Sequence, residues 1–183
     1  PASPVPPMPW GRCRSSSRWK TPLETPWTGR CGISLVVIGY GNPGRLDDGL
    51  GPAFAERVQA LQLPGVSVES NYQLNIEDAE LISTYDIVVF ADASVDAHEP
   101  FDFEPMHSTP PVVGFSSHSI KPESLLGLAE ELFNATPQAC AMAIRGYDFN
   151  EFGESLSDTA SANLDAAVGF FQEWVQTRRA KLG

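Results

Sequence analysis

The segment 36–51 joins an apolar strand, a glycine-rich turn and the start of a helix without interruption. The turn contains three glycines and ends in two adjacent carboxylates, namely Gly39, Gly41, Gly44, Asp47 and Asp48. A buried strand that passes through a tight turn directly into a helix is typical of α/β proteins with a parallel sheet. A glycine turn in this position commonly binds phosphate, whereas two carboxylates repel phosphate and attract a metal ion. The segment therefore predicts the fold class and leaves two kinds of ligand open.

Apolar, strand-like runs alternate with helical patterns from residue 33 onward. The predicted strands are 33–38, 66–70, 86–91, 101–104 and 139–145, and the predicted helices are 50–61, 75–81, 122–132 and 157–181. Asn75 and Ser157 are expected to cap the second and last helices, and Pro122 suits a first helical turn. Pro105 indicates an exposed edge strand, because proline cannot donate a hydrogen bond to a neighbouring strand. The alternation predicts a three-layer α/β/α sandwich around a mostly parallel, mixed sheet of five strands.

The first 32 residues differ in composition from the rest of the chain. They hold seven of the 16 prolines and five of the 12 Lys and Arg residues, with a single acid, Glu24. The remainder carries seven basic and 22 acidic residues. Prolines at this density cannot propagate a helix or a central strand. We therefore expect a disordered, basic, proline-rich arm over residues 1–32, or sequence upstream of the natural start, and a single domain over residues 33–183.

Composition excludes several classes of partner. A formal net charge of −11 and a pI near 4.6 argue against nucleic acid, because phosphate binding needs clustered Lys and Arg. No apolar run approaches the roughly 20 residues that span a membrane. Cys13, Cys31 and Cys140 show no metal-ligand spacing, and their odd number does not suit a disulfide framework. His98 and His107 lie in a polar stretch and are expected to face solvent. We expect a monomer of the reducing cytoplasm that binds neither nucleic acid nor membrane.

The three glycines also match the dinucleotide-binding pattern Gly-x-Gly-x-x-Gly, in which a pyrophosphate lies on the helix N-terminus. Glu69, at the end of the next predicted strand, would then bind the ribose. Asp47 and Asp48 oppose this interpretation, since carboxylates close to a pyrophosphate repel it. Asp47 is our candidate for the N-cap of the helix, or else for an auxiliary acid. A dinucleotide site stays as an alternative.

Two further polar residues are expected at the same edge of the sheet. Asp92 directly follows the strand 86–91, and His118 lies in a loop after another apolar run, 112–115. The ligand site of an open α/β sheet lies beyond the carboxyl ends of its strands, so Asp48, Asp92 and His118 would converge there. Two carboxylates and one imidazole form an incomplete ligand set for a divalent transition metal such as nickel or zinc. Each residue alone would also suit an ordinary turn or surface position, but together they predict a metal site.

These motifs, in this order over residues 33–183, resemble those of the hydrogenase maturation endopeptidases, which process the large subunit of nickel–iron hydrogenases. The matching segments are Ile38–Asn42, Asp47–Gly51, Phe90–Ala93, Ser117–Ser119 and Pro122–Leu126. The resemblance implies a peptidase that removes a C-terminal extension from the large-subunit precursor after nickel insertion. It also implies that Asp48, Asp92 and His118 recognise the substrate's nickel and carry the cleavage. Nickel would then arrive with the substrate and not be a permanently bound cofactor.

Two other functions remain as alternatives. The segment Asn42-Pro43-Gly44 resembles the peptidyl-tRNA hydrolases, but the Thr-Arg-His-Asn motif of those enzymes does not follow it here, and the acidic charge disfavours tRNA. A non-catalytic nickel-binding maturation chaperone would use the same two aspartates and histidine without cleaving anything. The sequence also leaves open whether the metal activates water or an aspartate acts as the general base.

Overall fold

The computed structural model describes residues 34–110 and 120–180. The expected arm over residues 1–32, the apolar run 112–115 and His118 lie outside the described residues. Among the helices that are described, none is long and apolar enough to cross a membrane.

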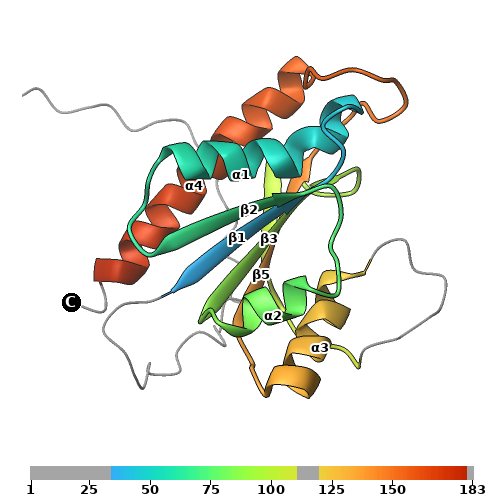
Figure 1. Ribbon diagram of the computed structural model, residues 1–183. Coiled ribbons are helices and arrows are strands. Elements are labelled where there is room, and N and C mark those ends of the chain that lie inside the picture. Colours follow the sequence, from blue (N-terminus) through green and yellow to red (C-terminus); the bar gives the residue numbers. More distant parts are fainter. Residues whose placement is uncertain (1–33, 111–119, 181–183) are drawn as a thin grey trace, which may run out of the picture. The chain divides into compact units, whose positions relative to one another are not determined.

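One five-stranded sheet runs through the described residues, with its strands in the order β2–β1–β3–β5–β4 (Figure 1). The strands are β1 (Leu35–Tyr40), β2 (Val66–Asn71), β3 (Ile87–Ser94), β4 (Phe101–Met106) and β5 (Gln138–Arg145). β1, β2, β3 and β5 run parallel, and β4 lies antiparallel beside β5 at one edge of the sheet. The mostly parallel, mixed sheet and its edge strand with Pro105 are therefore confirmed.

Helices cover both faces of this sheet (Figure 1). They are α1 (Leu50–Ala60), α2 (Asp78–Ser83), α3 (Pro122–Phe133) and α4 (Asp158–Ala180), and a short 3-10 helix, η2 (Leu46–Gly49), precedes α1. α1 and α4 lie on one face, and α2 and α3 lie on the other. This arrangement confirms the predicted three-layer sandwich.

The two central strands are buried on both faces, as their unbroken apolar runs predicted. Val36 in β1 and Val89 in β3 are both fully buried. Leu125 of α3 belongs to the core cluster on one side of the sheet. On the other side, the rings of Phe54 in α1 and Phe171 in α4 meet edge to face at 5.6 Å. Burial of these apolar side chains is the main force that holds the layers together.

The end of β3 differs from the prediction. The strand continues to Ser94, so Asp92 lies inside it and not after it. The cause is tertiary, because β3 pairs with β1 only as far as Ala91 but pairs with β5 through Ser94. Asp92 therefore lies one position beyond the point at which β1 and β3 separate.

The helix caps agree with the prediction in one case and differ in another. Ser157 caps α4 as expected, since its Oγ accepts a hydrogen bond from the Ala160 N–H at 3.3 Å. Asn75 does not cap α2, which begins only at Asp78 and has no side-chain cap. Instead the Asn75 N–H donates to the Asp78 carboxylate at 2.8 Å and the Asn75 oxygen accepts from the Asp78 N–H at 3.1 Å, so the two residues close a turn that precedes α2.

Candidate functional site

Asp48 and Asp92 lie at the carboxyl edge of the sheet, where β1 and β3 end side by side. Asp48 lies in η2, which follows β1 after the glycine turn, and its side chain is half-buried. Asp92 follows the last β1–β3 pair, which joins Gly39 to Ala91. The charge of Asp48 contributes to the raised pKa of Asp92, so the two carboxylates are close enough to interact. Two of the three predicted site residues are thus brought to one place.

The environment of Asp92 favours its protonated form. Burial raises its pKa to about 6, and the negative charge of Asp48 adds to the rise. Hydrogen bonds from the Ala93 N–H, at 2.8 Å, and from Tyr40 oppose it, because they stabilise the carboxylate. An aspartate with these properties gains or loses a proton close to neutral pH, as catalytic carboxylates often do.

Tyr40 is a member of this site that the sequence did not reveal. It is the last residue of β1, its ring packs against the core cluster under α2 and α3, and its hydroxyl interacts with Asp92. Burial, followed by the charges of Asp92 and Glu123, raises the pKa of Tyr40, so the hydroxyl remains a neutral hydrogen-bond donor. The only sequence signal for this contact is its position at the strand end, one residue before Gly41 in the turn.

Asp47 has a structural role that differs from both roles expected of it. Its side chain is fully buried and accepts hydrogen bonds from the N–H groups of Tyr147 (2.9 Å), Asp148 (3.0 Å) and Ser157 (2.7 Å) and from the Ser157 hydroxyl (2.8 Å). η2 and α1 have no side-chain cap, so the prediction that Asp47 caps the helix was wrong. Burial would raise the pKa of Asp47, but the hydrogen bonds outweigh burial and the pKa is lowered. A carboxylate with a lowered pKa, whose two oxygens already accept four hydrogen bonds, does not suit an auxiliary acid.

The glycine turn serves close packing of the chain on itself. A Cβ on Gly39 would lie 2.2 Å from the backbone oxygen of Gly51 in α1, and one on Gly41, whose φ is +140°, would lie 2.2 Å from the backbone oxygen of Asp48. The Asn42 N–H, which a phosphate would need, already donates to the Asp48 carboxylate at 3.2 Å. These contacts argue against the phosphate cradle of a dinucleotide-binding protein.

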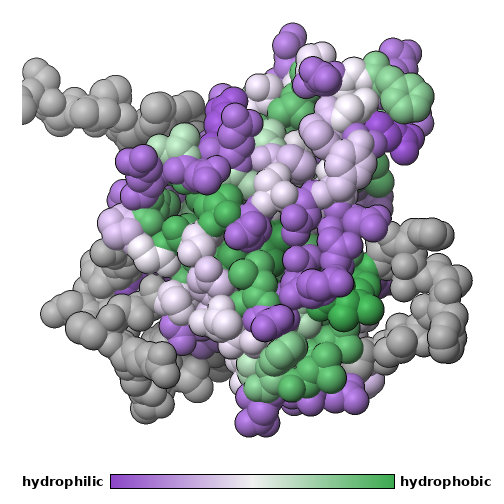
Figure 2. All heavy atoms as spheres, in the orientation of Figure 1, coloured by the Kyte–Doolittle hydropathy of each residue, from purple (hydrophilic) through white to green (hydrophobic). Residues whose placement is uncertain are grey.

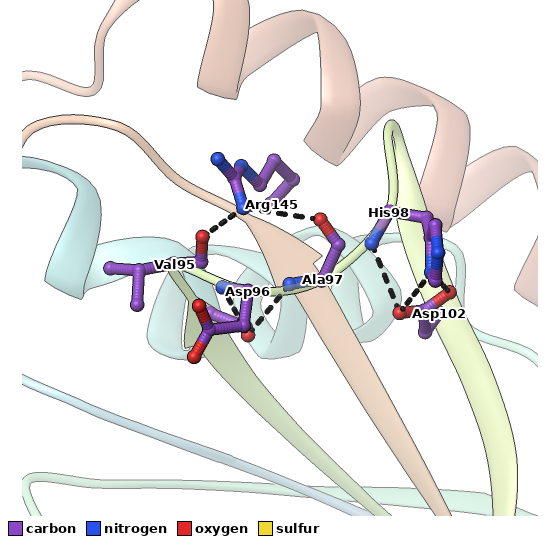
Figure 3. A network of polar contacts seen from close by, with 7 residues as sticks. Val95, Asp96, Ala97, His98, Asp102 and Arg145 are labelled. Atoms are coloured by element: carbon purple, nitrogen blue, oxygen red, sulfur yellow. Dashed lines mark hydrogen bonds and ion pairs between the residues drawn. The ribbon is translucent and has the colours of Figure 1, made fainter.

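The loop between β3 and β4 is fastened to the end of β5 by Arg145 (Figure 3). The guanidinium of Arg145 donates to the backbone oxygens of Val95 and Ala97, the second at 3.3 Å. His98, in the same loop, faces solvent as expected and pairs with Asp102 at 3.1 Å. This histidine is engaged with its own acid.

The described residues supply two carboxylates for a metal ion but no complete ligand group. Among residues 34–110 and 120–180, no three His, Cys, Asp or Glu side chains gather in a way that would hold a metal. Asp48 and Asp92 offer oxygen ligands, and the predicted third ligand, His118, lies outside the described residues. Cys140 is buried in β5, and burial raises the pKa of its thiol to about 11, which marks it as an unreactive core residue.

Comparison with known proteins gives a match in structure but not in sequence. No protein-family model and no curated protein matches the chain. The structure of HycI, a NiFe hydrogenase maturation protease from Thermococcus kodakarensis KOD1, superposes with a TM-score of 0.60 at 20% identity, over 77% of this chain and 91% of its own. The hydrogenase 2 maturation peptidase of a Thaumarchaeota archaeon gives a TM-score of 0.56 at 20% identity, over 78% and 97% of the two chains.

A third structure, the hydrogenase maturating endopeptidase HybD from E. coli, gives a TM-score of 0.57 at 18% identity, over 80% of this chain and 94% of its own. All three structures are covered almost completely, so the likeness extends over a whole domain and not a single motif. The chain therefore has the fold of the NiFe hydrogenase maturation proteases, which is the fold that its sequence motifs implied.

Proposed function

We propose that this protein is an endopeptidase that removes the C-terminal extension of a nickel–iron hydrogenase large-subunit precursor after nickel insertion. The observation that carries the proposal is the position of Asp48 and Asp92 at the carboxyl edge of the sheet, after the last β1–β3 pair, where the charge of Asp48 contributes to the raised pKa of Asp92. The three solved structures compared above share this fold and are hydrogenase maturation proteases, which supports the same class of reaction here. The sequence motifs around both aspartates support it independently.

Nickel is part of the substrate in this proposal. Asp48 and Asp92 bind the nickel that the precursor already holds, together with His118 from the loop before α3. A divalent cation between the two carboxylates removes the repulsion through which Asp48 raises the pKa of Asp92. Only a precursor that has received its nickel is then held with its scissile peptide at the carboxyl edge of the sheet.

Hydrolysis of the peptide needs a polarised carbonyl and an acceptor for the proton of the attacking water. The nickel of the substrate supplies a Lewis acid for the carbonyl. Without the metal the pKa of Asp92 is about 6. The charge of the nickel holds Asp92 as a carboxylate in the complex, and a carboxylate can accept the proton of the attacking water. Tyr40 keeps the Asp92 carboxylate oriented through its hydroxyl.

The test is incubation of the purified protein with nickel-loaded and nickel-free precursor, followed by mass spectrometry of the precursor. We expect the nickel-loaded form alone to lose its extension. Asp48→Asn, Asp92→Asn and His118→Ala should each lower the rate by at least roughly 100-fold, the usual contribution of a positioned acid or base. Asp165→Asn is the control. Asp165 is an exposed residue of α4 that pairs with Arg57 of α1, so this variant should leave the rate unchanged.

Two outcomes would contradict this proposal in different ways. A precursor of unchanged mass that nevertheless binds the protein would identify a nickel-binding maturation chaperone. Cleavage of nickel-free precursor at the same rate would retain the peptidase but remove nickel from substrate recognition.

A further inference from the structure

The loop between β5 and α4, residues 146–157, is fastened to the turn that precedes Asp48. The Gly153 N–H donates to the Gly44 oxygen at 3.0 Å, and the Gly153 oxygen accepts from the Leu46 N–H at 2.9 Å. The packing is close as well, because a Cβ on Gly153 would lie 2.6 Å from the Leu46 side chain. The tip of the loop is therefore fixed beside the candidate site.

The buried carboxylate of Asp47 fixes both ends of the same loop. It accepts hydrogen bonds from Tyr147 and Asp148 at the start of the loop and from Ser157 at its end. The Asp47 N–H also donates to the Asp148 oxygen at 3.0 Å. A loop with this many buried hydrogen bonds at its ends loses little conformational entropy when it meets a partner.

The tip of this fixed loop carries an exposed aromatic side chain. Phe152 is 89% exposed, more than any other exposed large apolar side chain of the described residues. Apolar atoms among hydrophilic residues are visible at the upper right of Figure 2, where Figure 1 shows this loop. Other exposed large apolar side chains on loops of the same edge are Tyr72, Ile76, Val95 and Tyr147. An isolated exposed apolar residue is common, but one on a fixed backbone beside a candidate site is preorganised for binding.

Acidic residues accompany this aromatic ring. Glu151 and Glu154 flank Phe152 in the sequence, and both are exposed. Apart from the buried Asp47, four segments at the carboxyl edge together contain eight Asp or Glu residues and one Lys or Arg, and these segments are 41–49, 71–78, 95–100 and 146–157. A surface of this kind fits a protein that presents an apolar pocket with Lys or Arg at its rim.

We propose that the β5–α4 loop is the docking element for the precursor protein. Phe152 inserts into an apolar pocket on the precursor, and Glu151 and Glu154 face basic side chains around that pocket. The inference rests on the proposed function, since the precursor is its partner. Docking through this loop holds the substrate next to Asp48, because the same hydrogen bonds fix the loop and the turn.

The first test compares Phe152→Ala with Phe133→Ala in calorimetric binding to the nickel-loaded precursor and in its cleavage. Phe133 is an exposed phenylalanine at the far end of α3 and is the matched control. We expect Phe152→Ala to raise Kd and KM by roughly tenfold or more, as loss of an aromatic anchor does, with kcat unchanged. Phe133→Ala should leave both constants within about twofold of wild type. Equal Kd values for wild type and Phe152→Ala would overturn the docking role.

The second test reverses the charges beside the ring. The double variant Glu151→Lys with Glu154→Lys should slow association several-fold at low salt, and the difference should shrink as salt is added. Glu130→Lys with Glu131→Lys, beside Phe133, is the control and should have no such effect. Wild type that binds without cleaving would refute the proposed peptidase and leave the docking test valid. Wild type that neither binds nor cleaves would refute both.

Discussion

At the scale of single residues, opposing interactions determine the charge of Asp92. Burial and the charge of Asp48 raise its pKa to about 6, and the hydrogen bonds from Ala93 and Tyr40 limit that rise. An unperturbed aspartate, with a pKa near 3.9, would be ionised throughout the neutral range. Asp92 instead gains or loses its proton close to neutral pH, as a catalytic acid or base must.

The hydroxyl of Tyr40 should therefore control the protonation of Asp92. Tyr40→Phe removes a hydrogen bond that stabilises the carboxylate, so the pKa of Asp92 should rise by about one pH unit. Asp48→Asn removes the negative charge that raises the pKa of Asp92, so in this variant the pKa of Asp92 should fall. Carboxyl carbon chemical shifts, followed by NMR across pH 4 to 9, measure both effects.

A matched control separates this effect from a loss of packing. Tyr85→Phe also removes a hydroxyl from a tyrosine that packs on the same core cluster. Tyr85, however, lies before the amino end of β3, whereas Asp92 lies near its carboxyl end. It should leave the titration of Asp92 unchanged. A Tyr40→Phe protein with the wild-type titration would show that the hydroxyl does not act on Asp92.

The residues of the site differ in how far sequence could identify them. The sequence could place Asp48 and Asp92 at one edge of the sheet, because each follows an apolar run and the carboxyl ends of parallel strands meet there. The role of Asp47 could not be predicted, since its hydrogen-bond partners Tyr147 and Ser157 lie about 100 residues later in the chain. Tyr40 likewise acquires its role only through the pairing of β1 with β3.

At the scale of elements, the contact between β1 and α1 depends on glycine. Gly39→Ala would place a methyl group 2.2 Å from the Gly51 backbone oxygen and 2.7 Å from the Ala55 Cβ. The helix must move away from the sheet, so we expect the free energy of unfolding to fall by about 3 kcal/mol. Gly169→Ala is the control: nothing lies within 4 Å of its added Cβ in α4, and it should stabilise by about 1 kcal/mol.

Urea denaturation of the two alanine variants provides the measurement. Similar stability for both would show that β1 and α1 tolerate a wider separation than the described contact suggests.

The ends of the elements were harder to predict than their existence. Apolar runs identified the central strands, since a strand that is buried on both faces consists almost entirely of apolar residues. The end of β3 is set by β5, which pairs with it through Ser94. α2 begins later than predicted, because Asn75 and Asp78 hydrogen-bond to each other in a turn before the helix and the sequence pattern does not distinguish that turn from a capped helix.

At the scale of the whole molecule, the alternation of strands and helices was enough to predict the layered architecture, because such chains bury a parallel sheet between two layers of helices. The strand order β2–β1–β3–β5–β4 was not predictable in the same way. It depends on contacts between segments far apart in the sequence, as does the anchoring of the β5–α4 loop by Asp47. The position predicted for the site does not depend on this strand order, since the carboxyl ends of all parallel strands share one edge.

The pH dependence of stability should reflect both aspartates. The lowered pKa of Asp47 contributes stability that is present above the unfolded value near 3.9 and is lost as the pH falls through the folded value. The raised pKa of Asp92 acts oppositely: its contribution is complete below about 3.9 and is lost as the pH rises through about 6. The free energy of unfolding should therefore rise between pH 7 and about 5 and fall steeply below about 4.

Chemical denaturation followed by circular dichroism at a series of pH values tests this profile. Asp92→Asn should remove the rise and stabilise the protein at pH 7 by on the order of 1–2 kcal/mol, because a buried charge is replaced by a neutral amide. Asp47→Asn should destabilise it at pH 7 and weaken the acid-induced loss, since three N–H groups and a hydroxyl would lose a charged acceptor. If the stability of Asp92→Asn changed with pH in parallel with that of wild type, the pKa of Asp92 in the folded protein would be that of an ordinary aspartate. The stability gained in Asp92→Asn would come together with loss of cleavage, which is the expected relation when a destabilising charge is retained for function.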